Sequence, residues 1–280
     1  MRRIKTVDFT HLATLLILLL CLSGNSIAGC TRVINVPVAA TGLSVTTGED
    51  GVSGVYPELL RSLAEKGGCS FNFSVVPRAR LELMFENGTA DLMFPAKKTA
   101  QRDQYGIFVP LIINRAKLMS LDSKWPELRS AQDLIDRKSL RLVVVRGYDY
   151  GPGYQALINE LNKQKRLIFE ADPTSVARIL KAGGADLTIM TPYILVGAMS
   201  GDARIEDLIP KIRYESIDEL PWGDSGMYLS KAALSEADKT TLTTLLEQAA
   251  KSGQVWKSFQ HYYPDNMLKE SMRPLIPLQK

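Results

Sequence analysis

The stretch from Pro77 to Phe94, PRARLELMFENGTADLMF, decides the fold, because a second stretch of the chain has the same pattern. The second copy runs from Pro173 to Met190 as PTSVARILKAGGADLTIM. In both copies a helical segment leads through a glycine turn into a short apolar stretch, and Gly-x-Ala-Asp-Leu marks the turn. One such turn is common in α/β proteins, but two in matching contexts predict two similar lobes.

Strands and helices are expected to alternate around each copy. Before and within the first copy, apolar runs predict strands at 33–38, 71–76 and 90–94. Between them, a helix from Val55 to Gly67 and a second helix at 80–86 are expected. The second copy is preceded by its own strand, helix and strand at 141–145, 154–163 and 167–170. This order predicts parallel strands joined by right-handed crossovers.

The sequence therefore predicts an α/β protein of two lobes, each a mixed, mainly parallel sheet flanked by helices. We interpret short strands at 116–121 and 226–230 as crossings between the lobes. Two helices at 235–251 and 252–262 would then return to the first lobe. The predicted division places 29–117 and 226–280 in lobe 1 and 118–225 in lobe 2.

Residues 1–28 have the three-part pattern of a secretory signal peptide. A basic start with Arg2 and Lys5 precedes an apolar run at 12–22, which is too short for a membrane span. Small residues then stand at Ser26 and Ala28, where cleavage is expected. We expect an exported, periplasmic protein.

Two cysteines remain outside this segment, Cys30 and Cys69. An even pair in an oxidising compartment favours a disulfide, and adjacent parallel strands would bring both to the same sheet edge. In the alternative interpretation, residues 27–30 form a lipobox and Cys30 carries a lipid anchor. We favour the disulfide, because a strand-like run begins at Arg32 and leaves no tether.

Composition and charge argue against several classes of function. The net charge of +4 falls to about +2 without the first 28 residues, which predicts neither nucleic-acid nor polybasic membrane binding. Outside that segment the one histidine is His261, so neither a metal site nor histidine-based catalysis is expected. The sequence contains no nucleophile-elbow or phosphate-loop motif. We expect a monomeric binding protein without a cofactor, rather than an enzyme.

Candidate ligand contacts follow the carboxyl ends of the predicted strands, where open α/β sheets bind ligands. Thr99 is a plausible N-cap of a short helix, and Arg102 one turn later could hold a carboxylate, although it could equally pair with a neighbouring acid. Arg78 and Arg80 flank the end of the second strand, and one of them could face the cleft; Lys97 and Lys98 would suit an anion if they face inward. The complete predicted set is Tyr56, Arg80, Thr99, Arg102, Gly147, Tyr148, Asp149, Tyr150, Thr191 and Trp222.

These motifs, in this order, resemble the extracellular solute-binding proteins of family 3, which include polar amino-acid receptors of ABC importers. The resemblance is carried by GVYPELL at 54–60, VP at 76–77, GTADL at 88–92, TAQR at 99–102 and FVPL at 108–111. Weaker matches follow at 130–134, 143–147 and 226–231, so the resemblance spans nearly the whole chain after residue 28.

The resemblance implies a two-lobed fold that closes about a hinge. It also implies that Arg102 holds a ligand carboxylate, with help from the turn at 147–150. Such receptors often carry an aspartate after the last strand of lobe 2 that pairs with the ligand's ammonium group. Here that stretch is IMTPY at 189–193, which contains no acid. The expected ligand is thus a small carboxylate-bearing solute, either an amino acid or a relative without the amine.

The expected partner of such a protein is an ABC permease in the inner membrane. Two other functions stay open at this point. The protein could be a ligand-sensing module for a sensor kinase, or a dehydratase-like enzyme built on the same scaffold.

Overall fold

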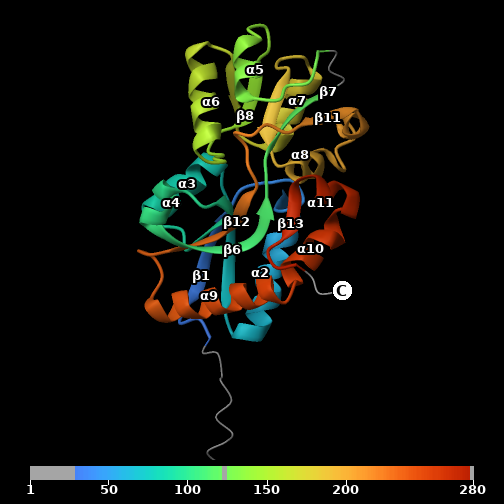
Figure 1. Cartoon of the computed structure of the whole chain (residues 1–280). Coiled ribbons are helices and arrows are strands. Elements are labelled where there is room, and N and C mark those ends of the chain that lie inside the picture. Colours follow the sequence, from blue (N-terminus) through green and yellow to red (C-terminus); the bar gives the residue numbers. More distant parts are fainter. Residues whose placement is uncertain (1–28, 122–124, 278–280) are drawn as a thin grey trace, which may run out of the picture.

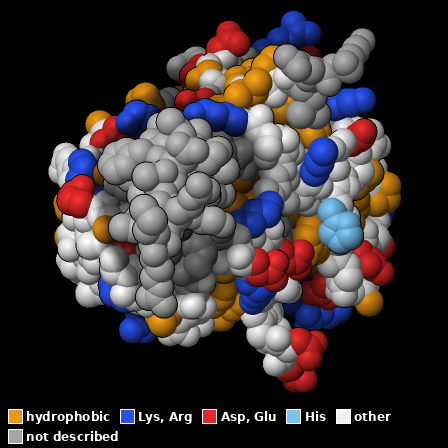
Figure 2. All heavy atoms as spheres, turned by 90° about the horizontal axis from the view of Figure 1, so that it is seen from below, with side chains coloured by type: hydrophobic (Ala, Val, Ile, Leu, Met, Phe, Trp, Pro, Cys, Tyr) orange, Lys and Arg blue, Asp and Glu red, His pale blue; other side chains and the backbone are white. Residues whose placement is uncertain are grey.

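The computed structural model describes residues 29–121 and 125–277, which form two α/β lobes (Figure 1). The expected signal peptide at 1–28 lies outside the described residues. Among those that are described, no helix is both long and apolar enough to cross a membrane. Basic and acidic side chains are interspersed on the visible part of the molecule seen from below (Figure 2), in keeping with the small net charge.

Lobe 1 is built from both ends of the chain. Its first part comprises β1 (Val33–Val38), β2 (Thr46–Gly48), β3 (Gly51–Ser53), α2 (Val55–Gly67), β4 (Ser70–Val75), α3 (Arg78–Glu86), β5 (Leu92–Lys97), α4 (Ala100–Tyr105) and β6 (Gly106–Asn114). Its second part comprises β12 (Gly223–Ser230), α9 (Glu236–Lys251), α10 (Gln254–Tyr262), α11 (Asp265–Ser271) and β13 (Met272–Pro274).

Lobe 2 is a continuous stretch of the chain between these parts. It comprises β7 (Lys117–Leu121), α5 (Ala131–Asp136), β8 (Leu142–Val145), α6 (Pro152–Lys163), β9 (Leu167–Glu170), α7 (Pro173–Lys181), β10 (Leu187–Met190), α8 (Pro192–Met199), the 3-10 helix η1 (Glu206–Lys211) and β11 (Ile212–Glu215). Its sheet has the strand order β11-β7-β10-β8-β9.

The sheet of lobe 2 is mixed, as predicted, but lobe 1 separates parallel and antiparallel pairs into different sheets, and antiparallel pairing is more extensive than the predicted, mainly parallel arrangement. Parallel pairs join β1 to β4, β8 to β9 and β10 to β8. The second sheet of lobe 1, in the order β13-β6-β12-β5, is antiparallel throughout. The reason is that the chain leaves lobe 1 along β6 and returns beside it along β12, in the opposite direction.

The aspartate of the repeated Gly-x-Ala-Asp-Leu turn makes the same kind of hydrogen bond in each lobe. In lobe 1 the Asp91 carboxylate accepts the backbone N–H of Asn35 at 2.6 Å. In lobe 2 the Asp186 carboxylate accepts the backbone N–H of Arg141 at 2.7 Å. Each aspartate thus ties its helix-to-strand turn to the neighbouring strand, which explains why the motif recurs.

The crossings between the lobes are short. The first covers residues 115–116, because β7 begins at Lys117 and already pairs with β10. The second covers 216–222, because β12 begins at Gly223 and pairs with β6. These placements put Lys117 in lobe 2 and residues 223–225 in lobe 1, a slight shift of the predicted boundaries. The returning helices α9 and α10 pack on α2 of lobe 1, as expected.

A disulfide joins Cys30 to Cys69, with the Cα atoms 4.7 Å apart. It lies where β1 and β4 begin, at the edge opposite the strand ends that face lobe 2. This confirms the predicted pairing. The alternative of a lipid anchor requires a free Cys30 sulfur, which the disulfide removes.

On one side the lobes meet through an apolar contact made by α8. The Tyr193 ring lies 5.4 Å from Phe259 and 5.6 Å from Tyr263, measured between centroids. Gly197 approaches lobe 1 so closely that a Cβ there would lie 2.5 Å from the Tyr263 hydroxyl and 2.6 Å from the Leu43 nitrogen. The core of lobe 1 therefore continues into lobe 2 at this contact, which we call the α8 seam (Tyr193, Gly197, Phe259, Tyr263).

Candidate functional site

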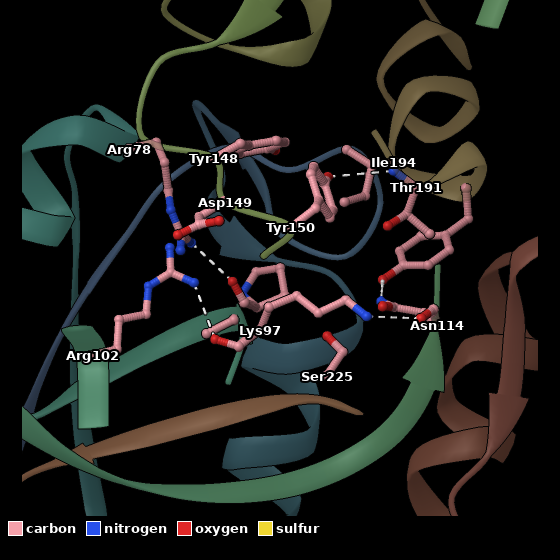
Figure 3. Close-up of a pocket in the computed structure, with 13 residues that line it drawn as sticks. Arg78, Lys97, Arg102, Asn114, Tyr148, Asp149, Tyr150, Thr191, Ile194 and Ser225 are labelled. Atoms are coloured by element: carbon pink, nitrogen blue, oxygen red, sulfur yellow. Dashed lines mark hydrogen bonds between the residues drawn. The ribbon is translucent and has the colours of Figure 1, made fainter. Parts of the chain in front are cut away.

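A small cavity of about 30 Å³ lies between the lobes, where the carboxyl ends of their strands meet. Arg102, Tyr148 and Asp149 also line an outer pocket of about 170 Å³ toward the cleft mouth. The residues lining the inner cavity are Arg78, Pro95, Ala96, Lys97, Arg102, Asn114, Tyr148, Asp149, Tyr150, Thr191, Tyr193, Ile194 and Ser225. Lobe 1 supplies the cations and lobe 2 supplies the three tyrosines of the lining (Figure 3).

Two buried arginines of lobe 1 share one carboxylate. Glu82 Oε1 accepts from Arg78 Nη2 and from Arg102 Nη2, each at 2.7 Å. Arg102 Nε donates to Glu82 Oε2 at 3.1 Å, so this pair is bidentate. The side chains of Arg78 and Arg102 are almost fully buried. Burial alone would raise the pKa of Glu82, but the charges of the two arginines outweigh it and hold that pKa below its usual value.

The same arginines fix the backbone that forms one wall of the cavity. Arg78 Nη1 donates to the carbonyl of Pro95 at 3.0 Å. Arg102 Nη1 donates to the carbonyl of Lys97 at 3.1 Å. The Thr99 hydroxyl, at the N-cap of α4, accepts the backbone N–H of Arg102 at 3.2 Å. The segment 95–99 is therefore held from both sides.

Lys97 extends along the wall of the cavity toward Asn114 (Figure 3). Its ammonium group donates to the carbonyls of Asn114 at 2.9 Å and Gly223 at 3.1 Å. Burial lowers the pKa of Lys97 to about 8, against a smaller opposing effect of Asp224. The side chain is thus a half-buried cation whose two hydrogen-bond acceptors are neutral carbonyls.

Aromatic and hydroxyl groups complete the enclosure. The rings of Tyr148 and Tyr150 pack edge to face, with centroids 6.0 Å apart. Tyr150 accepts the backbone N–H of Thr191 at 3.3 Å, and Tyr193 accepts from the side-chain amide of Asn114 at 3.2 Å. Burial raises the pKa of Tyr148 to about 12, so its phenol stays protonated at neutral pH. One carboxylate oxygen of Asp149 accepts the backbone N–H of Gly151 at 2.8 Å.

The structure brings some of the sequence-predicted residues together at this cavity. Those that line it are Arg102, Tyr148, Asp149, Tyr150 and Thr191, while Thr99 and Gly147 line the outer pocket. Gly147 has φ +86°, and a Cβ there would lie 3.1 Å from the backbone of Ala79, so the lobes touch at this glycine.

Three predicted residues lie elsewhere. Arg80 is exposed and does not line the cavity; Arg78, two residues earlier, faces it because helix α3 turns the two side chains apart. Tyr56 is fully buried in the core of lobe 1 against Phe94 and Phe259. Trp222 lies in the second crossing, with the guanidinium carbons of Arg115 and Arg273 at 5.3 and 4.0 Å from its ring.

The sequence prediction did not include Arg78, Lys97, Asn114, Tyr193, Ile194 and Ser225 among the ligand contacts. The position of Lys97 did indicate a ligand contact, since a lysine at the end of a strand lies at the edge of the sheet where ligands bind. The sequence could not show whether its side chain points toward the cavity or toward solvent. Asn114 and Ser225 lie at the crossings, whose approach depends on the tertiary fold.

No protein-family model matches this chain, and no curated protein matches it. Solved structures do. The arginine-, lysine-, histidine-binding protein ArtJ from Geobacillus stearothermophilus aligns over 83% of this chain and 95% of its own, with a TM-score of 0.67 and 16% identity. A putative L-cystine ABC transporter protein from Listeria monocytogenes aligns over 84% and 98%, with a TM-score of 0.66 and 17% identity.

A histidine kinase sensor domain similar to periplasmic binding proteins aligns over 83% of this chain and 96% of its own, with a TM-score of 0.64 and 18% identity. At these sequence identities the matches are evidence for the fold alone. They agree with the family that the sequence resembles, since several of these structures are amino-acid-binding proteins. The chain therefore has the two-lobed α/β fold of the periplasmic binding proteins.

Proposed function

We propose that this protein is an exported solute-binding protein that captures a small carboxylate-bearing solute between its lobes for an ABC importer. The observation that carries the proposal is the charge of the inner cavity. Arg78, Lys97 and Arg102 line it from one lobe, and Asp149 is the one acid among the described residues that lines it. Glu82 pairs with the two arginines, and the charge of Asp224 also acts on Lys97. An anion entering this enclosed space would gain charge-assisted hydrogen bonds that water does not match.

The geometry also favours a closing motion as the mechanism. The cations lie on lobe 1 and Tyr148, Tyr150 and Thr191 on lobe 2, so a solute that contacts both groups stabilises the closed arrangement. The described cavity has room for little more than a water molecule. Entry of a solute therefore requires the lobes to part, and we expect the polar mouth at Gly147 to open rather than the apolar α8 seam.

Asp149 is the acidic residue that lines this cavity among the described residues. It does not align with the aspartate that binds the ligand's ammonium group in the amino-acid receptors, but its carboxylate could accept hydrogen bonds from such a group. One of its carboxylate oxygens is used by Gly151, and the other has no hydrogen-bond partner among the described residues. The proposed ligand class thus includes amino acids as well as simple carboxylates. No residues in the described ranges form a cluster that could hold a metal ion, and the proposal invokes no cofactor and no catalytic step.

A thermal-shift screen of the purified protein tests this proposal. The panel contains L-amino acids, succinate and benzoate, the neutral amides succinamide and benzamide, oligopeptides and sugars. Solutes that bind only the folded state raise the melting temperature by mass action. We expect shifts with carboxylates and none with the matched amides. Shifts confined to amides or sugars would contradict the proposed ligand class.

One observation favours a second function, ligand sensing for a membrane kinase. A sensor domain of that kind is among the structures that share this fold. The two functions predict different partners for the closed form. Co-purification of the exported chain with a permease supports import, and co-purification with a kinase supports sensing.

A further inference from the structure

The arginine that the family resemblance assigns to the ligand is already occupied by the protein. Arg102 forms a bidentate pair with Glu82, and Arg78 binds the same carboxylate. The side chains of both arginines are nearly inaccessible, and that of Glu82 is 17% exposed. Replacing Glu82 by a ligand carboxylate would exchange one such bond set for another, with little net gain.

Lys97 differs from the two arginines because its hydrogen-bond acceptors carry no charge. Its two hydrogen-bond acceptors are the carbonyls of Asn114 and Gly223, and it forms no ion pair with an acid among the described residues. Partial burial of a charge that forms no close ion pair costs free energy, and the more distant charge of Asp224 offsets only part of that cost. Two of its three ammonium protons are donated to the carbonyls, and the third is left for a partner at the cavity.

The position of Lys97 connects this cation to both crossings. Asn114 is the last residue of β6 and Gly223 the first of β12, and the two face each other across the antiparallel pair. These are the strands along which the chain leaves and re-enters lobe 1. The Lys97 ammonium group bridges their carbonyls at the point where the hinge begins.

We propose that Lys97, rather than Arg102, binds the anionic group of the solute, and that it does so at the hinge between the lobes. This inference rests on the proposed function and identifies its anion contact. The other ionisable groups around Lys97 are Asp224 on β12, Asp149 on the turn before α6, the tyrosines of lobe 2 and the Arg78–Glu82–Arg102 cluster; the tyrosines are Tyr148, Tyr150 and Tyr193. Arg102 is then a positioning residue, which holds the carbonyl of Lys97 itself.

Isothermal titration of the purified protein with succinate, benzoate and L-glutamate at pH 7 tests the assignment in four variants. Lys97→Met removes the charge at similar length, and Lys98→Met is the matched control, because Lys98 is exposed and pairs with Asp103. The double variant Glu82→Gln with Arg102→Ala removes the competing pair while preserving net charge. Lys97→Arg keeps the charge.

We expect Lys97→Met to weaken carboxylate binding by about tenfold or more, as the loss of a charged hydrogen bond predicts. Lys98→Met should stay within about threefold of wild type. The double variant should lose less affinity than Lys97→Met, because Arg102 acts through the backbone carbonyl of Lys97, and Lys97→Arg should retain more affinity than Lys97→Met. Unchanged binding in Lys97→Met, or a loss in the double variant as large as in Lys97→Met, would overturn the assignment and leave the proposed function standing. A wild-type protein that binds neutral solutes and none of the three carboxylates would contradict both.

Should Lys97→Met fail to fold, the pH profile of the wild-type protein decides. Because the Lys97 pKa is about 8, its charge in the ligand-free protein is lost above that pH, whereas the arginines stay charged. Affinity for succinate should then fall by about tenfold between pH 7 and 9.5. An affinity that stays constant over this range excludes Lys97 as the anion contact.

Discussion

The Glu82 carboxylate and the Arg102 guanidinium form a bidentate ion pair inside the cleft, at 2.7 and 3.1 Å. A carboxylate at this arginine is what the sequence resemblance implies, but here the protein itself supplies one, from the neighbouring helix α3. The pair closes one wall of the cavity and reduces the charge that a solute meets there. The effect of this ion pair on stability can be measured in the ligand-free protein.

Glu82→Gln should remove an acid-sensitive part of the stability. The arginines lower the folded-state pKa of Glu82, so its contribution is present above the unfolded pKa of about 4.5 and is lost as the pH falls through the folded value. We therefore expect the wild-type melting temperature to fall more between pH 6 and 3 than that of Glu82→Gln. The control is Glu86→Gln on the same helix, which removes the same charge away from the arginines. Equal acid-induced losses in Glu82→Gln and wild type would contradict this role.

Opening the Cys30–Cys69 bond should destabilise lobe 1 and leave binding intact. The two cysteines are 39 residues apart in sequence, and closing such a loop stabilises a fold by about 4 kcal/mol in the chain-entropy model. Urea unfolding of Cys30→Ala/Cys69→Ala against wild type measures this loss. Because the bond lies at the strand ends remote from the cleft, ligand affinity below the transition should be unchanged. A large loss of affinity in the folded variant would place the ligand elsewhere.

Gly197→Ala should disturb the α8 seam. A Cβ at this position meets the Tyr263 hydroxyl and the Leu43 backbone at distances that no packed structure tolerates. We expect a loss of about 1–3 kcal/mol in unfolding free energy, typical of overpacking, together with weaker carboxylate binding. Gly48→Ala is the control, because nothing lies within 4 Å of its added Cβ. Unchanged stability in Gly197→Ala would show that α8 is not docked on lobe 1 in solution.

The ligand-free protein should become relatively more stable as the pH rises from 8 to 10. Burial lowers the folded-state pKa of Lys97 below its unfolded value, so the unfolded chain binds more protons in this range and the folded state gains. The difference in unfolding free energy between wild type and Lys97→Met should therefore shift toward wild type with increasing pH. Taking the difference removes the contributions of other groups. A difference that does not change with pH would mean that Lys97 has an ordinary pKa.

Much of the fold could be predicted from local sequence. The helix-to-strand repeat at Asp91 and Asp186 could be recognised from its local pattern, although the strand residues that these aspartates bind lie 56 and 45 residues away in sequence. The cysteine pair followed from the parallel order of β1 and β4. Element β13 could not be predicted, because a three-residue strand with a proline becomes a strand only when β6 lies beside it.

The candidate site was harder to predict, since its residues are chosen by tertiary approach. The segment at 148–150 and Thr191 follow strands and could be placed at the ligand edge. Which arginine of α3 faces inward depends on the rotation of a short helix, so the sequence left Arg78 and Arg80 as alternatives, and Arg80, which the predicted set contains, is the exposed one. The partner of Arg102 was equally hidden, because Glu82 is 20 residues away in sequence.

The central claim is that the cavity between the lobes selects a carboxylate. Isothermal titration of the wild-type protein with benzoate and benzamide, and with succinate and succinamide, tests it most directly, because each pair differs in charge and hardly in shape. Charge-assisted bonds in the cavity predict that the carboxylate of at least one pair binds at least about tenfold more tightly than its amide. Equal affinities within each pair, or tighter binding of the amides, would contradict the account.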